Sequence, residues 1–347
     1  MKNTLLLTAL FISAFYTPGN AQTEKKFYSA CIAFWNVENL YDTINEPAKN
    51  DEEFLPSGLN RWNTEKYLKK LDRLSEVIAQ LGTEFNPDGP AIIGLAEIEN
   101  IAVLNDLVKQ TSILSRNYKP ILFEGPDRRG VDVALLYNPK YFSPKSQVLY
   151  KLTDPNDTSF ATRGQLLVSG TLDGERMHFV VAHWPSRRGG EKRSRPKRAL
   201  AANLGRSIID SIQKAETGAK IIYMGDLNDD PVNESVFKVI QASAKKTDST
   251  GNKLYNPMYP LFKNGIGSLA WNDSWNLFDQ MLLTATFLAT QQPGFQFHQA
   301  KVFNKPFLRQ DSGNFKGYPW RTFSAGTYTA GYADHFPVYL ILKKEVK

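Results

Sequence analysis

Acidic, amide and imidazole side chains stand at the ends of apolar segments throughout this 347-residue sequence. They are Asn36, Glu38, Glu97, Glu99, His183, Asp226, Asn228, Asp279, Asp334 and His335. Any one of them alone is better explained as a turn or cap residue. Six segment ends that all carry such groups are harder to dismiss, because a rigid sheet could present them at one rim.

The residue types at this predicted rim favour magnesium or manganese. These ions prefer carboxylate and carbonyl oxygens together with water, and Asn36, Glu97, Asp226 and Asp334 offer such oxygens. With four histidines and one cysteine in the chain, a zinc site is not expected. Hydrolysis of a phosphodiester needs an aligned water, charge stabilisation and help for the leaving oxygen, which two histidines and a metal could supply. The sequence has no Gly-x-Ser-x-Gly elbow and no Walker loop, so neither a serine hydrolase nor nucleotide-driven transfer is indicated.

These side chains must be positioned by strands and helices, whose apolar patterns are visible in the sequence. The predicted strands are Ser29–Val37, Ala91–Ala96, Val131–Tyr137, Gln165–Leu172, Met177–Ala182, Lys220–Met224, Phe278–Thr284 and Phe336–Leu342. The predicted helices are Thr64–Leu81, Val103–Gln110, Arg195–Gln213 and Asn233–Gln241. Asp173-Gly174 predicts a tight hairpin. The pattern indicates an α/β protein with two largely antiparallel sheets packed face to face and helices outside.

The first 21 residues predict a secretory signal peptide. Lys2 gives a positive start, Leu5–Phe15 is an apolar run, and Gly19-Asn20-Ala21 offers small residues before a cleavage point at Gln22. The apolar run is too short to span a bilayer. We therefore expect residues 22–347 to form one exported domain, periplasmic or secreted, which is monomeric and has no stable membrane insertion.

The charge balance favours an anionic partner. The formal net charge is +7, and loss of Lys2 lowers it by one. Such a protein suits nucleic acid, phosphorylated lipid or phosphorylated sugar. The stretch 187–198 follows His183 and holds seven Lys or Arg against one Glu, which favours a phosphate-binding loop and helix start around Pro196. A solvated charge run is the competing interpretation, and Trp184 could either stack on a base or pack inside.

The segment-end motifs resemble those of the endonuclease/exonuclease/phosphatase superfamily, which includes DNase I-like nucleases. The resemblance covers essentially the whole chain after the signal peptide, and six motifs occur in the family's order. The first, at 34–42 (FWNVENLYD), looks like the opening of a secreted bacterial branch. The others are 94–100 (GLAEIEN), 183–187 (HWPSR), 225–228 (GDLN), 279–280 (DQ) and 334–338 (DHFPV).

This resemblance implies a fold and a metal site. The fold would be the DNase I-like four-layer α/β sandwich, in which helices flank two face-to-face, mostly antiparallel sheets. Glu97 would bind Mg²⁺, with Mn²⁺ as an alternative. Asn36 and Asp334 would be further ligands, directly or through water.

The resemblance also implies catalytic roles. His183 and His335 would bind the scissile phosphate and act as acid and base, and Asp279 would hold His335 in the useful tautomer. Asp226 and Asn228 would orient or activate the attacking water. Whether Asp226 or His335 is the base stays open, and a second metal ion would recruit Asp226 as a ligand.

Arginines near these motifs are candidate phosphate contacts. They are Arg129, Arg163 and Arg187. A guanidinium matches phosphate in bidentate fashion, although surface solvation explains each of them equally well.

Our first prediction of function is therefore an exported metal-dependent nuclease. The second is a phosphatase or phosphodiesterase acting on sugar phosphates, inositol phosphates or sphingomyelin-type lipids. The third, an inactive binding module, is disfavoured because all the expected polar positions are filled. The sequence does not distinguish DNA from RNA or endo- from exo-action. We expect the loops at about 245–267 and 291–330 to lie near the rim and influence substrate choice.

Overall fold

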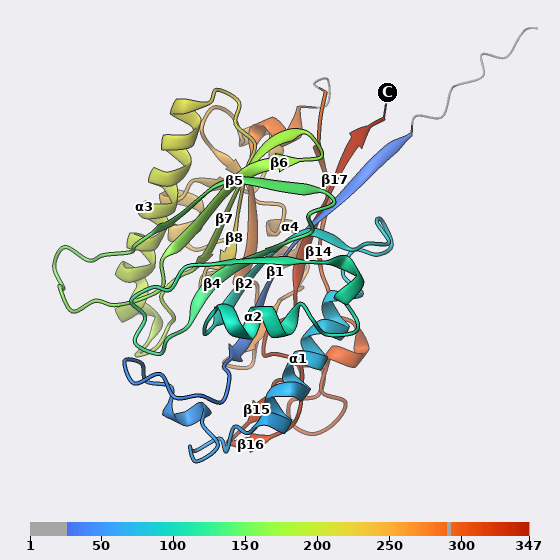
Figure 1. Cartoon of the computed structure of the whole chain (residues 1–347). Helices are drawn as coiled ribbons and strands as arrows, with labels where there is room; N and C mark the ends of the chain where they lie inside the picture. The colour runs from blue at the N-terminus through green and yellow to red at the C-terminus, as the bar shows by residue number, and fades with distance from the viewer. Residues whose placement is uncertain (1–25, 290–292, 347) are drawn as a thin grey trace, which may run out of the picture.

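The computed structural model describes residues 26–289 and 293–346, so the predicted signal peptide lies outside the described residues. Two large sheets carry the fold, with the strand orders β14-β17-β1-β2-β4-β3 and β5-β6-β7-β8-β13-β10-β9 (Figure 1). The first sheet consists of Phe27–Leu40 (β1), Pro90–Ile98 (β2), Lys119–Leu122 (β3), Asp132–Tyr137 (β4), Gln296–Val302 (β14) and Val338–Glu345 (β17). The second consists of Phe142–Tyr150 (β5), Gln165–Leu172 (β6), Glu175–His183 (β7), Ile221–Asp226 (β8), Ala242–Ser243 (β9), Leu254–Tyr255 (β10) and Asp279–Thr284 (β13).

Most neighbouring strands are antiparallel, as predicted, and the parallel pairs are β1–β2, β7–β8 and β9–β10. Two small hairpins lie outside the sheets, namely Leu269–Trp271 (β11) with Ser274–Asn276 (β12), and Phe323–Ser324 (β15) with Thr327–Tyr328 (β16). The α-helices are Thr64–Ile78 (α1), Ile101–Leu107 (α2), Glu191–Ala215 (α3) and Tyr259–Lys263 (α4). Within the described ranges, no helix has the length and apolarity needed to cross a bilayer.

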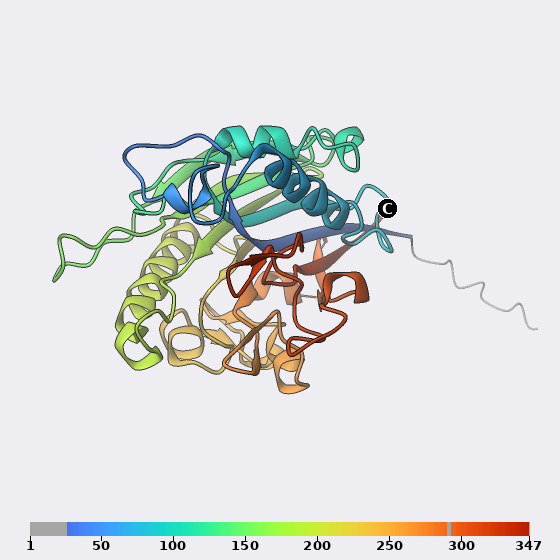
Figure 2. The ribbon, with the colours of Figure 1, turned by 90° about the horizontal axis from the view of Figure 1, so that it is seen from below.

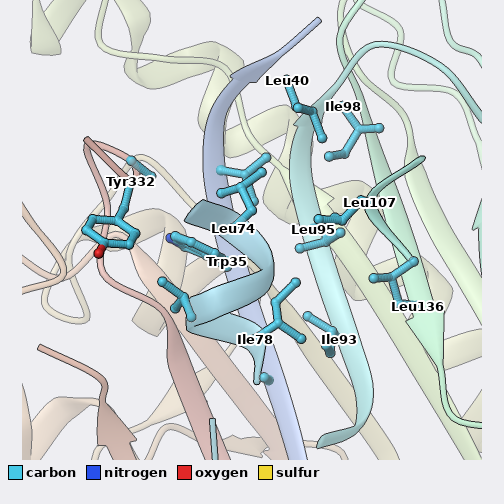
Figure 3. Close-up of a cluster of buried hydrophobic side chains, with 14 of the residues drawn as sticks. Trp35, Leu40, Leu74, Ile78, Ile93, Leu95, Ile98, Leu107, Leu136 and Tyr332 are labelled. Carbon is cyan, nitrogen blue, oxygen red and sulfur yellow. The ribbon is translucent and has the colours of Figure 1, made fainter. Parts of the chain in front are cut away.

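Three apolar cores separate four layers, which confirms the predicted sandwich. The central core lies between the two sheets and includes Phe34 of β1 and Met224 of β8. Helices α1 and α2 cover the outer face of the first sheet, where Leu74 and Ile78 meet Trp35 (Figure 3). Helix α3 covers the outer face of the second sheet, and Figure 2 shows it on the opposite side of the molecule from α1 and α2.

Local chemistry explains where α1 begins and what holds it. The side chain of Asn63 accepts the Lys66 backbone N–H and so caps the first turn. Leu71, Leu74 and Ile78 recur at helical spacing and are fully buried. Truncating Leu74 to alanine would remove about 2–5 kcal/mol of folding free energy, because a cavity would remain.

The hairpin between β6 and β7 has the predicted turn. Asp173 and Gly174 have φ values of 45° and 80°, and Leu172 pairs with Glu175 across them. Two positive φ values define the two-residue turn that matches the twist of paired strands. The strand pair therefore brings His183 to its position with a fixed register.

Several boundaries differ from the predictions for identifiable reasons. Strands β3, β5 and β14 were missed, because they stand at or beside sheet edges and carry partly exposed side chains without a long apolar run. The segment predicted as a helix at 233–241 forms only a short π-type helix at Ser235–Val239. Helix α3 begins at Glu191 and not at Arg195, so Pro196 lies inside it and removes one backbone hydrogen bond.

Candidate active site

Neighbouring strands of the second sheet end on a row of polar side chains. His183 of β7 pairs with Asp226 of β8, and Asp226 pairs with Asp279 of β13. Side chains directly opposite on adjacent strands share one face of the sheet. Val181 and Met224, two positions before His183 and Asp226, belong to the core between the sheets. The row therefore lies on the inner face of the second sheet, at the rim of the sandwich.

Asp226 stands at the centre of this row. Its Oδ1 accepts the Asn228 backbone N–H at 2.9 Å, and its Oδ2 accepts Asn36 Nδ2 at 3.0 Å. The Nε2 atoms of His183 and His335 lie 3.4 Å and 3.9 Å from Oδ2. Burial raises the pKa of Asp226, and the nearby His335 offsets part of that effect, which leaves it at about 6. A carboxyl group with a pKa near neutrality can accept a proton from water.

His335 is held by two residues of the second sheet and its adjoining loop. Its Nδ1 lies 2.6 Å from Asp279 Oδ2, and Ser268 Oγ donates to the same oxygen at 2.5 Å. Burial lowers the pKa of His335, but the carboxylates of Asp279 and Asp334 outweigh burial and hold the pKa well above its ordinary value. The surroundings of His335 therefore favour its protonated form.

The pKa of His183 is shifted in the opposite direction. Burial, together with the cations of Arg163 and Arg129, holds the pKa of His183 well below its ordinary value. Its Nδ1 is buried and finds no hydrogen-bond partner in the described part of the chain. Pairs of titratable groups whose surroundings separate their pKa values are the usual arrangement for acid and base work.

The first sheet contributes Glu38 and Glu97 to the site from segments of irregular backbone. Glu38, Asn39 and Glu97 have φ values of 55°, 50° and 66°, and the pairing of β1 with β2 shifts register across this stretch. Bulges of this kind re-aim side chains at the ends of strands. The Asn39 N–H donates to Glu97 Oε2 at 2.9 Å, which joins the two bulged segments.

Three carboxylates gather around two cations at this bulged end. Arg321 binds Asp334 Oδ2 through Nη2 at 3.0 Å and Glu38 Oε1 through Nε at 3.2 Å. Lys70 of α1 is buried with its Nζ 3.9 Å from Glu38 Oε2. Burial lowers the pKa of Arg321, but the carboxylates of Asp334, Glu38 and Glu97 raise it above its ordinary value.

The residues present fit a divalent metal. Glu97 and Asp334 carry carboxylates on side chains that are 14% and 32% exposed, so an ion and its waters could reach them. Ligand atoms of Asp226, Asp279 and His335 also lie within 4.8 Å of one another. Asp279 Oδ2, however, is already engaged by His335 and Ser268. Asp334 Oδ2 is likewise engaged by Arg321, and binding of Mg²⁺ or Mn²⁺ by Glu97 and Asp334 remains a prediction.

The other predicted residues of the site are brought to the same rim. Asn36 offers its Oδ1 to the Glu38 backbone N–H at 3.1 Å, so both ends of its amide are engaged. Asn228 has φ 50° and donates Nδ2 to Trp184 O at 3.0 Å. Direct roles of Asn36 at a metal and of Asn228 at water remain predictions.

The candidate phosphate-binding arginines occupy different surroundings. Arg129 has a side chain 39% exposed, with Nη2 3.9 Å from Glu97 Oε1, so it borders the site. Arg163 is buried and donates to Asp127 Oδ2 at 3.1 Å and to Trp184 O at 2.9 Å. Trp184 itself is buried and donates to the Tyr223 hydroxyl, so it packs inside and offers no face to a base.

Part of the basic stretch at 187–198 binds residues 228–229, which follow β8. Arg187 donates to Asn228 O at 2.9 Å and to Asp229 Oδ1 at 3.1 Å. Arg198 of α3 is fully buried, with Nε 2.8 Å from the same Asp229 oxygen. The exposed cations of the stretch include Arg188, Lys192 and Arg193. Contact of Arg129, Arg163 or Arg187 with phosphate therefore remains a prediction.

Sequence reasoning missed residues that tie the site together. Ser268 and Arg321 lie in irregular segments, where no apolar strand marks a rim position. Lys70 looked like a polar residue on a helix surface, yet it donates to Thr322 Oγ1 and Tyr332 O beneath the site. A lysine within the apolar face of α1 was the available signal for this contact.

Comparison with known proteins bears on both the fold and the motifs. The sequence model of the Endonuclease/Exonuclease/phosphatase family matches residues 31–344. Comparison with curated protein sequences gives no match.

Solved structures of similar fold cover nearly the whole chain. D. rerio TDP2 complexed with single strand DNA product has 18% identity and a TM-score of 0.54, over 90% of this chain and 98% of that one. An endonuclease/exonuclease/phosphatase family protein from Bacteroides thetaiotaomicron has 15% identity and a TM-score of 0.55, over 93% and 97%. The mannosyl-6-phosphatase Bt3783 of B. thetaiotaomicron VPI-5482 has 15% identity and a TM-score of 0.52, over 90% and 99%. At these identities the likeness establishes the fold.

Proposed function

Because the chain belongs to the endonuclease/exonuclease/phosphatase family of phosphate-ester hydrolases, we propose that it is an exported nuclease dependent on Mg²⁺ or Mn²⁺. One observation carries the reaction chemistry. Asp226 Oδ2 lies 3.4 Å from His183 Nε2 and 3.9 Å from His335 Nε2, and the surroundings lower the pKa of His183 and raise that of His335. A base and an acid are thus available side by side at neutral pH.

Asp226 is the group best suited to activate the attacking water. Its pKa lets it accept a proton near neutral pH, and hydrogen bonds from Asn36 and Asn228 fix the orientation of its carboxylate. The surroundings of His335 favour its protonated form, which makes it the weaker candidate for the base. We therefore assign the base role to Asp226, one of the two groups that the sequence left open.

The two histidines are suited to bind the scissile phosphate. His335 presents Nε2–H as a cationic donor, and Asp279 fixes the orientation of the ring from its other side. Neutral His183 can donate one hydrogen bond to a phosphate oxygen. A metal ion held by Glu97 and Asp334 would stabilise the negative charge that develops on the phosphate.

Nucleic acid is the substrate class that the surface favours. The chain is basic, and exposed cations stand at the start of α3, in the helix that follows the His183 segment. Exposed aromatic rings lie beside the site, including Trp271 and Trp275, and such rings stack on unpaired bases. A structural neighbour, D. rerio TDP2, is complexed with single strand DNA product.

Plasmid nicking tests the proposal. Wild-type protein with Mg²⁺ is expected to nick plasmid DNA, and EDTA is expected to stop the reaction until Mg²⁺ is restored. His183→Ala and Asp226→Ala should abolish turnover while circular dichroism and the melting temperature show a folded protein. Intact plasmid together with rapid phosphate release from hexose phosphates would favour a sugar phosphatase instead, the activity named for Bt3783.

Export and a monomeric state belong to the same proposal. N-terminal sequencing of the protein recovered from the periplasm or medium is expected to begin at Gln22. Size-exclusion chromatography with light scattering is expected to give one chain per particle. A protein that keeps Met1 and remains inside the cell would contradict export.

A further inference from the structure

A pocket of about 240 Å³ adjoins the catalytic residues and shares Asp334 and Arg321 with the candidate site described above. One wall is the tip of the β11–β12 hairpin, where Asn272 and Asp273 both have positive φ. The other wall comes from residues within 310–325, and Asp334 and Arg321 complete the lining. The pocket therefore opens beside a candidate metal ligand, where the group esterified to the phosphate must lie.

Aromatic rings connect this pocket to the catalytic histidine. Phe315 and Tyr318 line it with ring centroids 6.2 Å apart. Trp275 meets Tyr318 edge-on at 5.5 Å and lies nearly parallel to Phe336 at 6.0 Å. Phe336 is buried and directly follows His335. Phe315 is 44% exposed and so keeps a face free for a ligand ring.

The polar lining suits the remaining parts of a nucleotide. Gln310 and Asn272 each offer a hydrogen-bond donor and an acceptor, as the edge of a base requires. Arg321 stands at the border with the catalytic site, fixed by Asp334 and by Glu38. Glu38 is only 5% exposed, so this guanidinium rests on a buried support. A base would thus meet the aromatic end of the pocket, and the sugar-phosphate side would face Arg321, which is paired with two carboxylates.

We propose that this pocket binds one unpaired nucleotide of the substrate strand, with its base against Phe315 and Tyr318. The proposal rests on the nuclease function proposed above. A volume of about 240 Å³ suits a single nucleoside, so we expect one base to leave its partner and enter the pocket. Arg321 then lies on the sugar-phosphate side, next to the candidate metal ligand Asp334.

A substrate with a single scissile bond tests the pocket directly. We would measure hydrolysis of a dinucleoside monophosphate with Mg²⁺, and of two analogues that each lack one base. For Phe315→Ala, the KM for the intact substrate is expected to rise about tenfold at an unchanged kcat, because stacking acts equally on ground and transition states. Phe237→Ala is the matched control, since Phe237 is 45% exposed but lines a different pocket.

The abasic analogues identify the contact. With one of them, the KM of the wild-type protein is expected to rise by the same factor. The KM of Phe315→Ala is expected to rise no further, because the ring and the base are partners in one interaction. An unchanged KM in Phe315→Ala would overturn the nucleotide pocket but not the nuclease function. So would KM increases from the substitution and from the missing base that multiply when the two are combined. A wild-type protein that hydrolyses hexose phosphates and no dinucleotide would instead overturn the nuclease function itself.

Discussion

The two sheets of the sandwich supply the candidate site in different ways. The second sheet presents His183, Asp226 and Asp279 from regular strand ends in matched register. The first sheet presents Glu38 and Glu97 from bulged segments with positive φ. The regular half brings buried titratable groups together, whereas the bulged half leaves Glu97 partly exposed, where we propose that an ion reaches it.

This difference indicates a division of labour that follows from geometry. Strand register fixes neighbouring side chains closely, which suits proton transfer over hydrogen-bond distances. A bulge turns a carboxylate out of the strand alternation, which suits an ion that also keeps several waters. Each half can be perturbed separately, and the following predictions do so from the largest expected effect to the smallest.

Removal of the His335 ring should lower the rate most, because the ring lies against Asp279 of the regular half. For His335→Ala we expect kcat to fall about 10³-fold, since a positioned acid or base contributes on that order. His178→Ala is the matched control, because His178 is a buried β7 histidine that bonds Ser169 and Glu216 outside the site. Steady-state hydrolysis of a dinucleoside monophosphate measures both, and equal losses in the two variants would refute the assignment.

Removal of the carboxylate behind that histidine should cost less. Asp279→Asn is expected to lower kcat by about 10²-fold, because the imidazolium loses its stabilising partner while the ring remains. The pKa of His335 should fall, since Asp279 now raises it, and the protonated form should be lost at a lower pH than in the wild type. NMR titration of the imidazole follows this directly. An unmoved pKa would show that the two residues are not coupled.

A change in the bulged half should alter the metal requirement. Glu97→Gln is expected to raise the Mg²⁺ concentration for half-maximal rate by roughly 10–100-fold. His335→Ala should leave that concentration unchanged, because His335 contacts Asp279 of the second sheet and is not among the predicted metal ligands. Metal titrations of both variants test this. A raised Mg²⁺ requirement in His335→Ala with none in Glu97→Gln would contradict the proposed difference between the two halves.

The smallest effect is expected at the hydroxyl that supports Asp279. Ser268→Ala removes a hydrogen bond of 2.5 Å to the buried carboxylate. We expect kcat to fall about tenfold, the scale of one hydrogen bond to a charged group. A rate equal to the wild type would mean that Asp279 is positioned by His335 alone.

The difference between regular strand ends and bulged segments also explains which features of the site could be predicted from the sequence. The rim residues His183 and Asp226 were predicted because unbroken apolar strands lead directly to them. Positive φ at Glu38 and Glu97 has no signature in apolar periodicity, so those bulges could not be predicted. Strands β3, β5 and β14 escaped because partly exposed positions interrupt their apolar pattern.

Long-range contacts set the other limit on prediction. Arg321 belongs to the loop at about 291–330 that was predicted near the rim, but its contacts there, like that of Ser268, could not be predicted. In the stretch at 187–198, Arg187 and Arg198 turn to Asp229, and phosphate binding by the stretch stays a prediction. Charge composition alone cannot reveal such internal pairing.

The most direct test of the division of labour is to locate the ion. Anomalous diffraction from crystals grown with Mn²⁺ would place it without reference to activity. We predict a single strong peak against Glu97 and Asp334, on the bulged side of the site. A peak enclosed by Asp226, Asp279 and His335, with none at Glu97, would contradict the account.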